Sequence, residues 1–192
     1  MNTSTNPLFL GWGNSSSNDD WMKSTPPTFG ALPTVAVMPC AMVFTFNMAE
    51  GSILNCSVTG TNTVSYFRVV TNSTTTTILR RSGEACATIE WYPRPVISGK
   101  GIPAQPTSQF LPISADRRRR GAMFQGKPYS WIPRGNAICL YDNDGSTSGE
   151  FAIITQNHTK ATLTLPIPAF NAGFFEMSVV AAVLFLSGRN ID

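Results

Sequence analysis

Short apolar or alternating runs separated by turn residues dominate the chain from Val35 onward. Strands that recur about every eight to twelve residues are typical of all-β sandwiches and barrels, and no βαβ unit is visible. The predicted strands are Met42–Asn47, Ser65–Thr71, Thr76–Arg81, Ala85–Tyr92, Phe110–Ile113, Ala122–Phe124, Pro128–Ile132, Ala137–Tyr141, Glu150–Thr155 and Ala161–Leu165.

Three junctions between these runs contain residues typical of hairpin turns. They are Ser82–Gly83, Gln125–Gly126 and Asn143–Gly145. Glycine at such positions adopts the positive φ that tight hairpin turns require. The junctions therefore predict antiparallel neighbours.

The segment Ala172–Leu186 is apolar apart from Gly173, Glu176 and Ser178. It is too long for an ordinary strand and does not alternate, which favours a helix, although its valines leave two shorter strands as an alternative. A helix over Phe174–Ser187 would be about 21 Å long, short of the roughly 30 Å of a bilayer's hydrocarbon core. The pattern therefore favours a buried helix over a membrane span.

A helix that is hydrophobic on all sides must be surrounded by protein. Strands can surround it only when their sheet curls into a barrel. We therefore predict a mainly β fold, a closed antiparallel barrel that encloses a hydrophobic C-terminal helix at about residues 173–187. Residues 36–192 would form this single domain, and residues 1–35, which lack periodicity, are predicted to be a flexible leader.

Several short motifs follow one another in a characteristic order between Met42 and Phe185. They are Ile53–Val58, Tyr66–Thr71, Thr77–Gly83, Ile89–Trp91, Phe124, Gly126–Trp131 and Leu140–Asp142, followed by the terminal hydrophobic helix. In this order and spacing the chain resembles a fungal family of unknown function in the Tubby-C-like superfamily, which also contains phospholipid scramblases and LURP-one-related proteins. The resemblance covers about three quarters of the chain and implies a barrel of about 12 strands around a central helix.

The resemblance also bears on function, because relatives in the superfamily bind phosphoinositides or are linked to lipid movement. No motif of this chain carries over a functional residue from them. The family has no assigned activity, so the resemblance implies a lipid-related role without naming a site.

The net charge of +3 is too small to predict non-specific binding to nucleic acid, and no nucleic-acid partner is expected. Positively charged residues form one cluster along the chain, the run Arg117, Arg118, Arg119 and Arg120. Four guanidinium groups can bind phosphate oxygens, so this run is the candidate site for a phosphoinositide headgroup or an anionic membrane. A solvated loop without a ligand is the alternative.

Catalytic and metal-binding motifs are not apparent. The single histidine, His158, has no second histidine or cysteine pair beside it, and the four cysteines form no CxxC motif. We expect buried free thiols rather than disulfides. Asp142–Gly145 lacks the glutamate of a calcium loop, and Gly145–Gly149 has threonine at the nucleophile position of a GxSxG motif. Neither an enzyme nor a cofactor or metal is predicted.

The sequence therefore predicts a non-enzymatic domain that binds anionic phospholipid or phosphoinositide at a membrane surface. The alternative is a protein-interaction or structural barrel whose partner is a protein and which has no lipid ligand. The first residues, Met1 to Lys23, are rich in Asn, Ser, Gly and Asp and do not form a secretory signal. We expect an intracellular, cytoplasmic protein that is peripheral to the membrane.

Overall fold

The computed structural model describes residues 41–49, 51–143, 149–157 and 160–192, which belong to one compact unit, Met38–Asp192. The predicted leader, residues 1–35, lies outside the described residues. The strands are β1 (Ala41–Ala49), β2 (Ser52–Thr59), β3 (Ser65–Thr71), β4 (Thr75–Arg80), β5 (Ala85–Glu90), β6 (Val96–Gly99), β7 (Ile102–Pro106), β8 (Arg120–Phe124), β9 (Lys127–Arg134), β10 (Ala137–Asp142), β11 (Ala152–Gln156) and β12 (Ala161–Pro166). The helices are α1 (Thr107–Phe110), α2 (Ile167–Asn171) and α3 (Phe174–Leu186).

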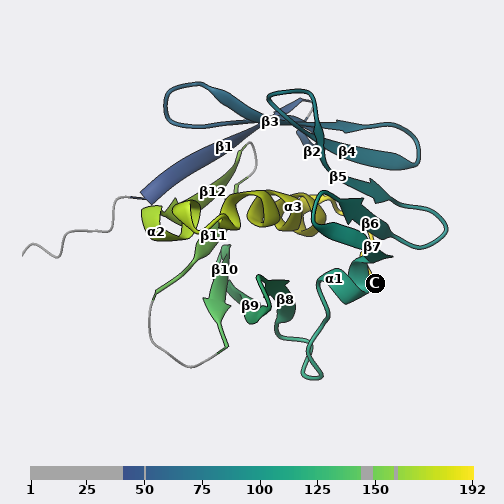
Figure 1. The fold of residues 1–192 in the computed structure, drawn as a ribbon, viewed down its shortest axis with the longest axis vertical. Helices are drawn as coiled ribbons and strands as arrows, with labels where there is room; N and C mark the ends of the chain where they lie inside the picture. The colour runs from purple at the N-terminus through teal and green to yellow at the C-terminus, as the bar shows by residue number, and fades with distance from the viewer. Residues whose placement is uncertain (1–40, 50, 144–148, 158–159) are drawn as a thin grey trace, which may run out of the picture. The chain divides into compact units, whose positions relative to one another are not determined.

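All twelve strands form one antiparallel sheet in the order β7-β6-β5-β4-β3-β2-β1-β12-β11-β10-β9-β8. The first and last strands pair in its middle, where Phe44 of β1 lies opposite Leu163 of β12. This pairing leaves β7 and β8, which are consecutive along the chain, at the two edges of the sheet. Figure 1 shows α3 between the strands β1 to β5 on one side and β8 to β11 on the other.

Alternation of side chains gives the sheet an apolar inner face and a polar outer face. Phe44 and Phe46 are at most 1% exposed, whereas threonines next to such buried residues along the strands, such as Thr45, point outward. Four of these threonines, Thr59, Thr45, Thr162 and Thr155, occupy opposite positions on adjacent strands. β-Branched side chains pack well in such cross-strand rows and fix the register of the sheet.

The predicted hairpins at Gly83 and Gly126 are confirmed. Gly83 has φ of 85° in the β4–β5 turn, and Gln125 and Gly126 have φ of 50° and 76° in the β8–β9 turn. Two successive residues at positive φ are typical of the type I′ turn, whose twist matches that of paired strands. The β10–β11 hairpin is also formed, but Gly145 in its turn lies outside the described residues.

The predicted C-terminal helix is confirmed as α3, and the alternative of two strands is wrong. Every residue from Met177 to Leu184 is buried, and α3 packs against β2, β11 and β12. At its start Phe175 stacks on Phe44 with ring centroids 3.9 Å apart. Within the described ranges, no helix is both long and apolar enough to cross a membrane.

Closure of the barrel is not confirmed, because no ladder between β7 and β8 exists in the described part of the chain. The predicted strand Phe110–Ile113 is wrong: Phe110 ends α1, and only Ile113 forms an isolated bridge, to Arg120. The pattern also missed β2, β6 and β7. Of these, β6 and β7 are short and contain glycine or proline. Such residues are depleted in strands because they weaken or interrupt the ladder.

Candidate functional site

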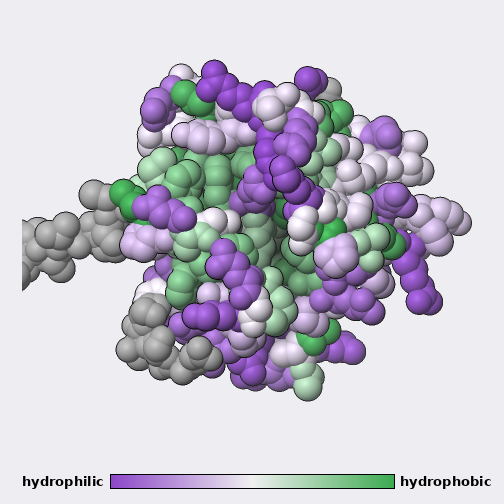
Figure 2. Space-filling model, viewed as in Figure 1, coloured by the Kyte–Doolittle hydropathy of each residue, from purple (hydrophilic) through white to green (hydrophobic). Residues whose placement is uncertain are grey.

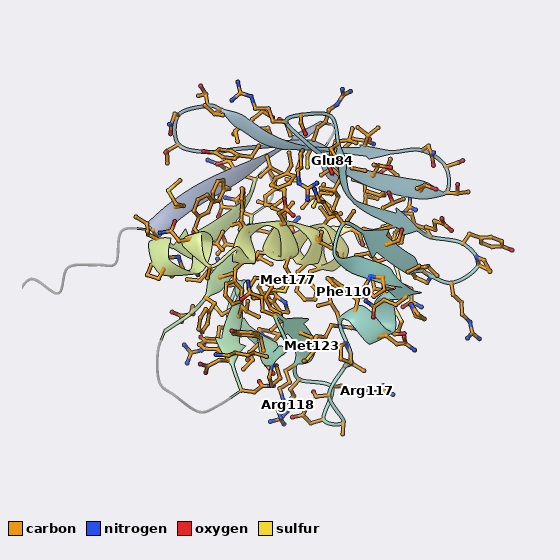
Figure 3. The ribbon with its side chains drawn as sticks, in the orientation of Figure 1. Glu84, Phe110, Arg117, Arg118, Met123 and Met177 are labelled. Carbon is orange, nitrogen blue, oxygen red and sulfur yellow. The ribbon has the colours of Figure 1, made fainter. Side chains whose placement is uncertain are left out.

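The predicted arginine run lies in the segment Ile113–Arg120, which follows α1 and ends at the first residue of β8. We call this segment the arginine loop. Arg117, Arg118 and Arg119 are exposed, and none of the three forms an ion pair with a carboxylate among the described residues. Figure 3 shows Arg117 and Arg118 at the tip of this loop, away from α3. These three guanidinium groups are therefore accessible to an anion.

Arg120 has a different, structural role. Its Nη1 donates to the carbonyl of Leu111 at 2.9 Å, and its two terminal nitrogens donate to the Asp192 carboxylate at 2.8 and 2.7 Å. These hydrogen bonds hold the pKa of Asp192 below its usual range. Arg120 already pairs with an acid 72 residues away, so its guanidinium group is engaged within the protein, unlike those of Arg117, Arg118 and Arg119.

The backbone of the arginine loop is held by its own polar groups. The Ser114 amide donates to the Arg119 carbonyl at 2.9 Å, and the Arg118 amide donates to Asp116 Oδ1 at 3.1 Å. The Ser114 hydroxyl also donates to Asp116, and this bond is the main cause of the lowered pKa of that carboxyl. Arg117 adopts φ of 56°, which the turn requires. The guanidinium groups therefore project from a formed turn.

A small pocket of about 150 Å³ lies against the arginine loop. All four arginines line it, together with Ile113, Trp131 and Phe185. Trp131 is 1% exposed, and its Nε1 has no hydrogen-bond acceptor among the described residues. A buried donor normally finds an acceptor, so this N–H is unusual, but the nitrogen itself has almost no solvent-accessible surface. Ile113 is 44% exposed and adds an apolar surface beside the cations.

A larger cleft of about 670 Å³ lies between the edge strands β7 and β8, with α3 as its floor. Phe110, Met123 and Met177, from α1, β8 and α3, gather around it (Figure 3). Figure 2 shows hydrophobic residues in a hollow at the centre of the same face. Met123 is 64% exposed, so an apolar surface is available to a ligand.

Four charged residues lie at one side of this cleft. Arg80 donates to both carboxylate oxygens of Glu176 at 2.6 and 2.8 Å. Glu84 lies 3.2 Å from Arg80 and 3.3 Å from Lys100. The hydrogen bonds from Arg80 lower the pKa of Glu176 and raise the pKa of Arg80 itself. Two cations face two anions, so the group carries no net charge.

The described cysteines, Cys56, Cys86 and Cys139, are buried free thiols, as predicted. Burial raises the pKa values of Cys56 and Cys86 to about 12, which keeps these thiols protonated and unreactive at neutral pH. In the described ranges no three residues of the His, Cys, Asp and Glu types are placed to hold a metal ion. His158 lies outside the described residues.

Residues 51–189 match a family of unknown function, DUF6593, over most of the chain. The chain belongs to this family. An X-ray structure of a protein from Arabidopsis thaliana is similar at 15% identity and a TM-score of 0.40, over 77% of this chain and 91% of that one. No curated protein matches the chain. The DUF6593 assignment confirms the predicted family of unknown function, and these matches do not show a Tubby-C-like or fungal origin.

Sequence reasoning located the arginines of this DUF6593 protein but missed the residues that surround them. Trp131 belongs to β9 and lies opposite Arg120 across the β8–β9 hairpin, whereas Phe185 in the same pocket comes from α3. The cleft combines residues of β7, β8, α1 and α3. No local motif marks either site, because each forms only when distant segments meet in the fold.

Proposed function

We propose that this protein is a non-enzymatic Tubby-C-like domain that binds anionic phospholipid or phosphoinositide at a membrane surface. The superfamily assignment is supported by the twelve strands, the central β1–β12 pair and the buried C-terminal helix. On this proposal, the sheet curls into a barrel that is open between its edge strands β7 and β8. We also propose an intracellular, membrane-peripheral location, where the cytoplasmic leaflet supplies anionic lipid.

The observation that carries the proposal is the set of three exposed arginines that form no ion pair with a carboxylate among the described residues and that line a pocket beside exposed Ile113. Arginine binds phosphate through paired N–H groups, so the three exposed arginines offer several donors to a phosphate group. Exposed Ile113 would then contact the apolar part of the membrane interface.

Each arginine near an anionic membrane surface contributes about 1 kcal/mol to the free energy of membrane binding. Arg117, Arg118 and Arg119 together would therefore change vesicle affinity by roughly a hundredfold. The test is sedimentation of the full chain with phosphatidylcholine vesicles, with and without phosphatidylserine or a phosphoinositide, at low and high salt. We expect binding that needs anionic lipid, weakens with salt and is lost when the three arginines are replaced by alanine.

The control variant replaces Arg68, Arg81 and Arg94, which are also exposed, by alanine and so removes the same charge elsewhere. It should retain most of the binding. Equal losses in both variants would show that net charge, rather than the arginine loop, attracts the membrane. A wild-type chain that sediments with none of the vesicles would contradict the proposal and favour the protein-interaction or structural barrel.

A further inference from the structure

We infer that the cleft between β7 and β8 binds a single long acyl chain. Its volume of about 670 Å³ is within the range of roughly 300–1,000 Å³ found for sites of small ligands. Half-buried Ile102, Phe110 and Phe124 form its walls together with exposed Met123, and Met177 of α3 lies on its floor. Open apolar clefts of this kind mark ligand sites in soluble domains.

The floor of the cleft is apolar because α3 is apolar on every side. Gly173, Glu176, Met177 and Val180 line the cleft and lie on one stripe of the helix. Glu176 is the acid among them, and Arg80 binds both oxygens of its carboxylate. Met177 and the facing Met123 have flexible side chains that can adapt to an unbranched chain.

An inserted peptide strand fits this cleft poorly. β7 contains Pro103 and Pro106, which have no backbone N–H to pair with a new strand. The outer edge of β8 is partly occupied, because the Gly121 amide donates to the Pro112 carbonyl at 2.7 Å and Ile113 bridges to Arg120. The cleft therefore offers side-chain surface rather than two free strand edges, which favours an apolar ligand.

The charges at the cleft also favour a ligand whose buried part is neutral. Lys100 pairs with Glu84 at 3.3 Å, and Glu176 pairs with Arg80, so no unmatched charge is available for an ionic group inside. Desolvating an ionic headgroup there would not be compensated. The chain would enter the cleft and the headgroup would stay at its solvent side.

This inference rests on the proposed function, since a membrane lipid would supply the chain, but it can be tested without a membrane. The full chain is titrated with a fluorescent dansyl-labelled fatty acid, and the probe is displaced by palmitate or by lysophosphatidylcholine below its micellar concentration. Displacement by lysophosphatidylcholine shows that a lipid acyl chain fits, and displacement by palmitate alone limits the site to free fatty acid.

Two variants locate the bound chain. Met123→Asp places a charge on an exposed wall, and Ile102→Trp fills the cleft; each should weaken probe binding about tenfold or more. Ile167→Asp, a 39% exposed residue outside the cleft lining, should keep the affinity within about twofold. The far-ultraviolet circular dichroism of each variant checks that it is folded.

Probe binding by the wild type that both cleft variants weaken supports the inference. No saturable binding, or equal affinity in wild type and both folded cleft variants, would overturn it. Alanine at Arg117, Arg118 and Arg119 should leave probe binding intact. Vesicle binding that depends on these arginines without any probe binding would refute the acyl site alone, and probe binding without vesicle binding would refute the proposed membrane function alone.

Discussion

Replacing Leu184 by alanine tests whether α3 fills the interior of the sheet. Leu184 is 1% exposed and lies near the end of α3, within the fully buried stretch of the helix. The substitution removes three carbon atoms and leaves a cavity, which costs about 2–5 kcal/mol when the surroundings cannot collapse. A helix packed within a curled sheet has little freedom to move, so we expect the upper half of that range.

Leu186→Ala is the matched control, because Leu186 belongs to the same helix and is only partly buried. Leucine and alanine differ in helix propensity by well under about 1 kcal/mol, so the difference between the two variants reports burial. Urea unfolding followed by circular dichroism should show that Leu184→Ala lowers the free energy of unfolding by roughly 3–5 kcal/mol and that Leu186→Ala lowers it by about half as much or less. The melting temperature of Leu184→Ala should fall by about 6–20 °C. Equal effects, or a loss below about 1 kcal/mol at Leu184, would refute the enclosed helix.

Two further predictions concern polar groups at the core. A double-mutant cycle with Arg80→Met and Glu176→Gln should show favourable coupling between the two side chains in the free energy of unfolding near neutral pH. Arg80 lowers the pKa of Glu176 in the folded state. The coupling should therefore weaken in acid, as Glu176 is protonated at a pH below the usual glutamate pKa of about 4.3. Coupling that stays constant in acid would contradict this linkage. Thr76→Val should lower the free energy of unfolding by about 1–3 kcal/mol, because the hydroxyl of fully buried Thr76 accepts a hydrogen bond from Trp91 Nε1 at 2.8 Å. The control, Thr77→Val on the outer face, should change it by less than about 0.5 kcal/mol. Similar losses for the two would argue that this hydrogen bond contributes little.

The parts of the fold that the sequence predicts are those with a local physical signal. The apolar run of α3 is too long for a strand, and alternation with hairpin glycines marks β4, β5, β8 and β9. The sequence does not predict β7 because Pro103 and Pro106 interrupt the usual strand composition, and it does not predict β6 because that strand has four residues and ends at Gly99. β6 forms because it pairs with β5 and buries Ile97, and β7 forms because it pairs with β6; these tertiary contacts outweigh a weak local preference.

The site was predictable only in part for the same reason. Four consecutive arginines are visible in the sequence, but the pairing of Arg120 with Asp192 depends on the chain terminus returning to the loop. The cleft likewise depends on contacts between distant segments, whereas Trp131 lies opposite Arg120 across the β8–β9 hairpin, whose turn the sequence predicts. Charge clusters are therefore predictable from sequence, whereas their partners are set by tertiary structure.

The proposed contact between the arginine loop and the membrane can be measured with an environment-sensitive label. A nitrobenzoxadiazole group is attached to Ile113→Cys in a chain whose Cys40 is replaced by serine; the three described cysteines are buried and should not react. Adding vesicles that contain anionic lipid should shift the emission to the blue and increase its intensity, whereas a label at Asn62→Cys, exposed in the β2–β3 turn, should not respond. No change at residue 113 under conditions in which the protein sediments with the vesicles would contradict the central claim that the arginine loop contacts the membrane.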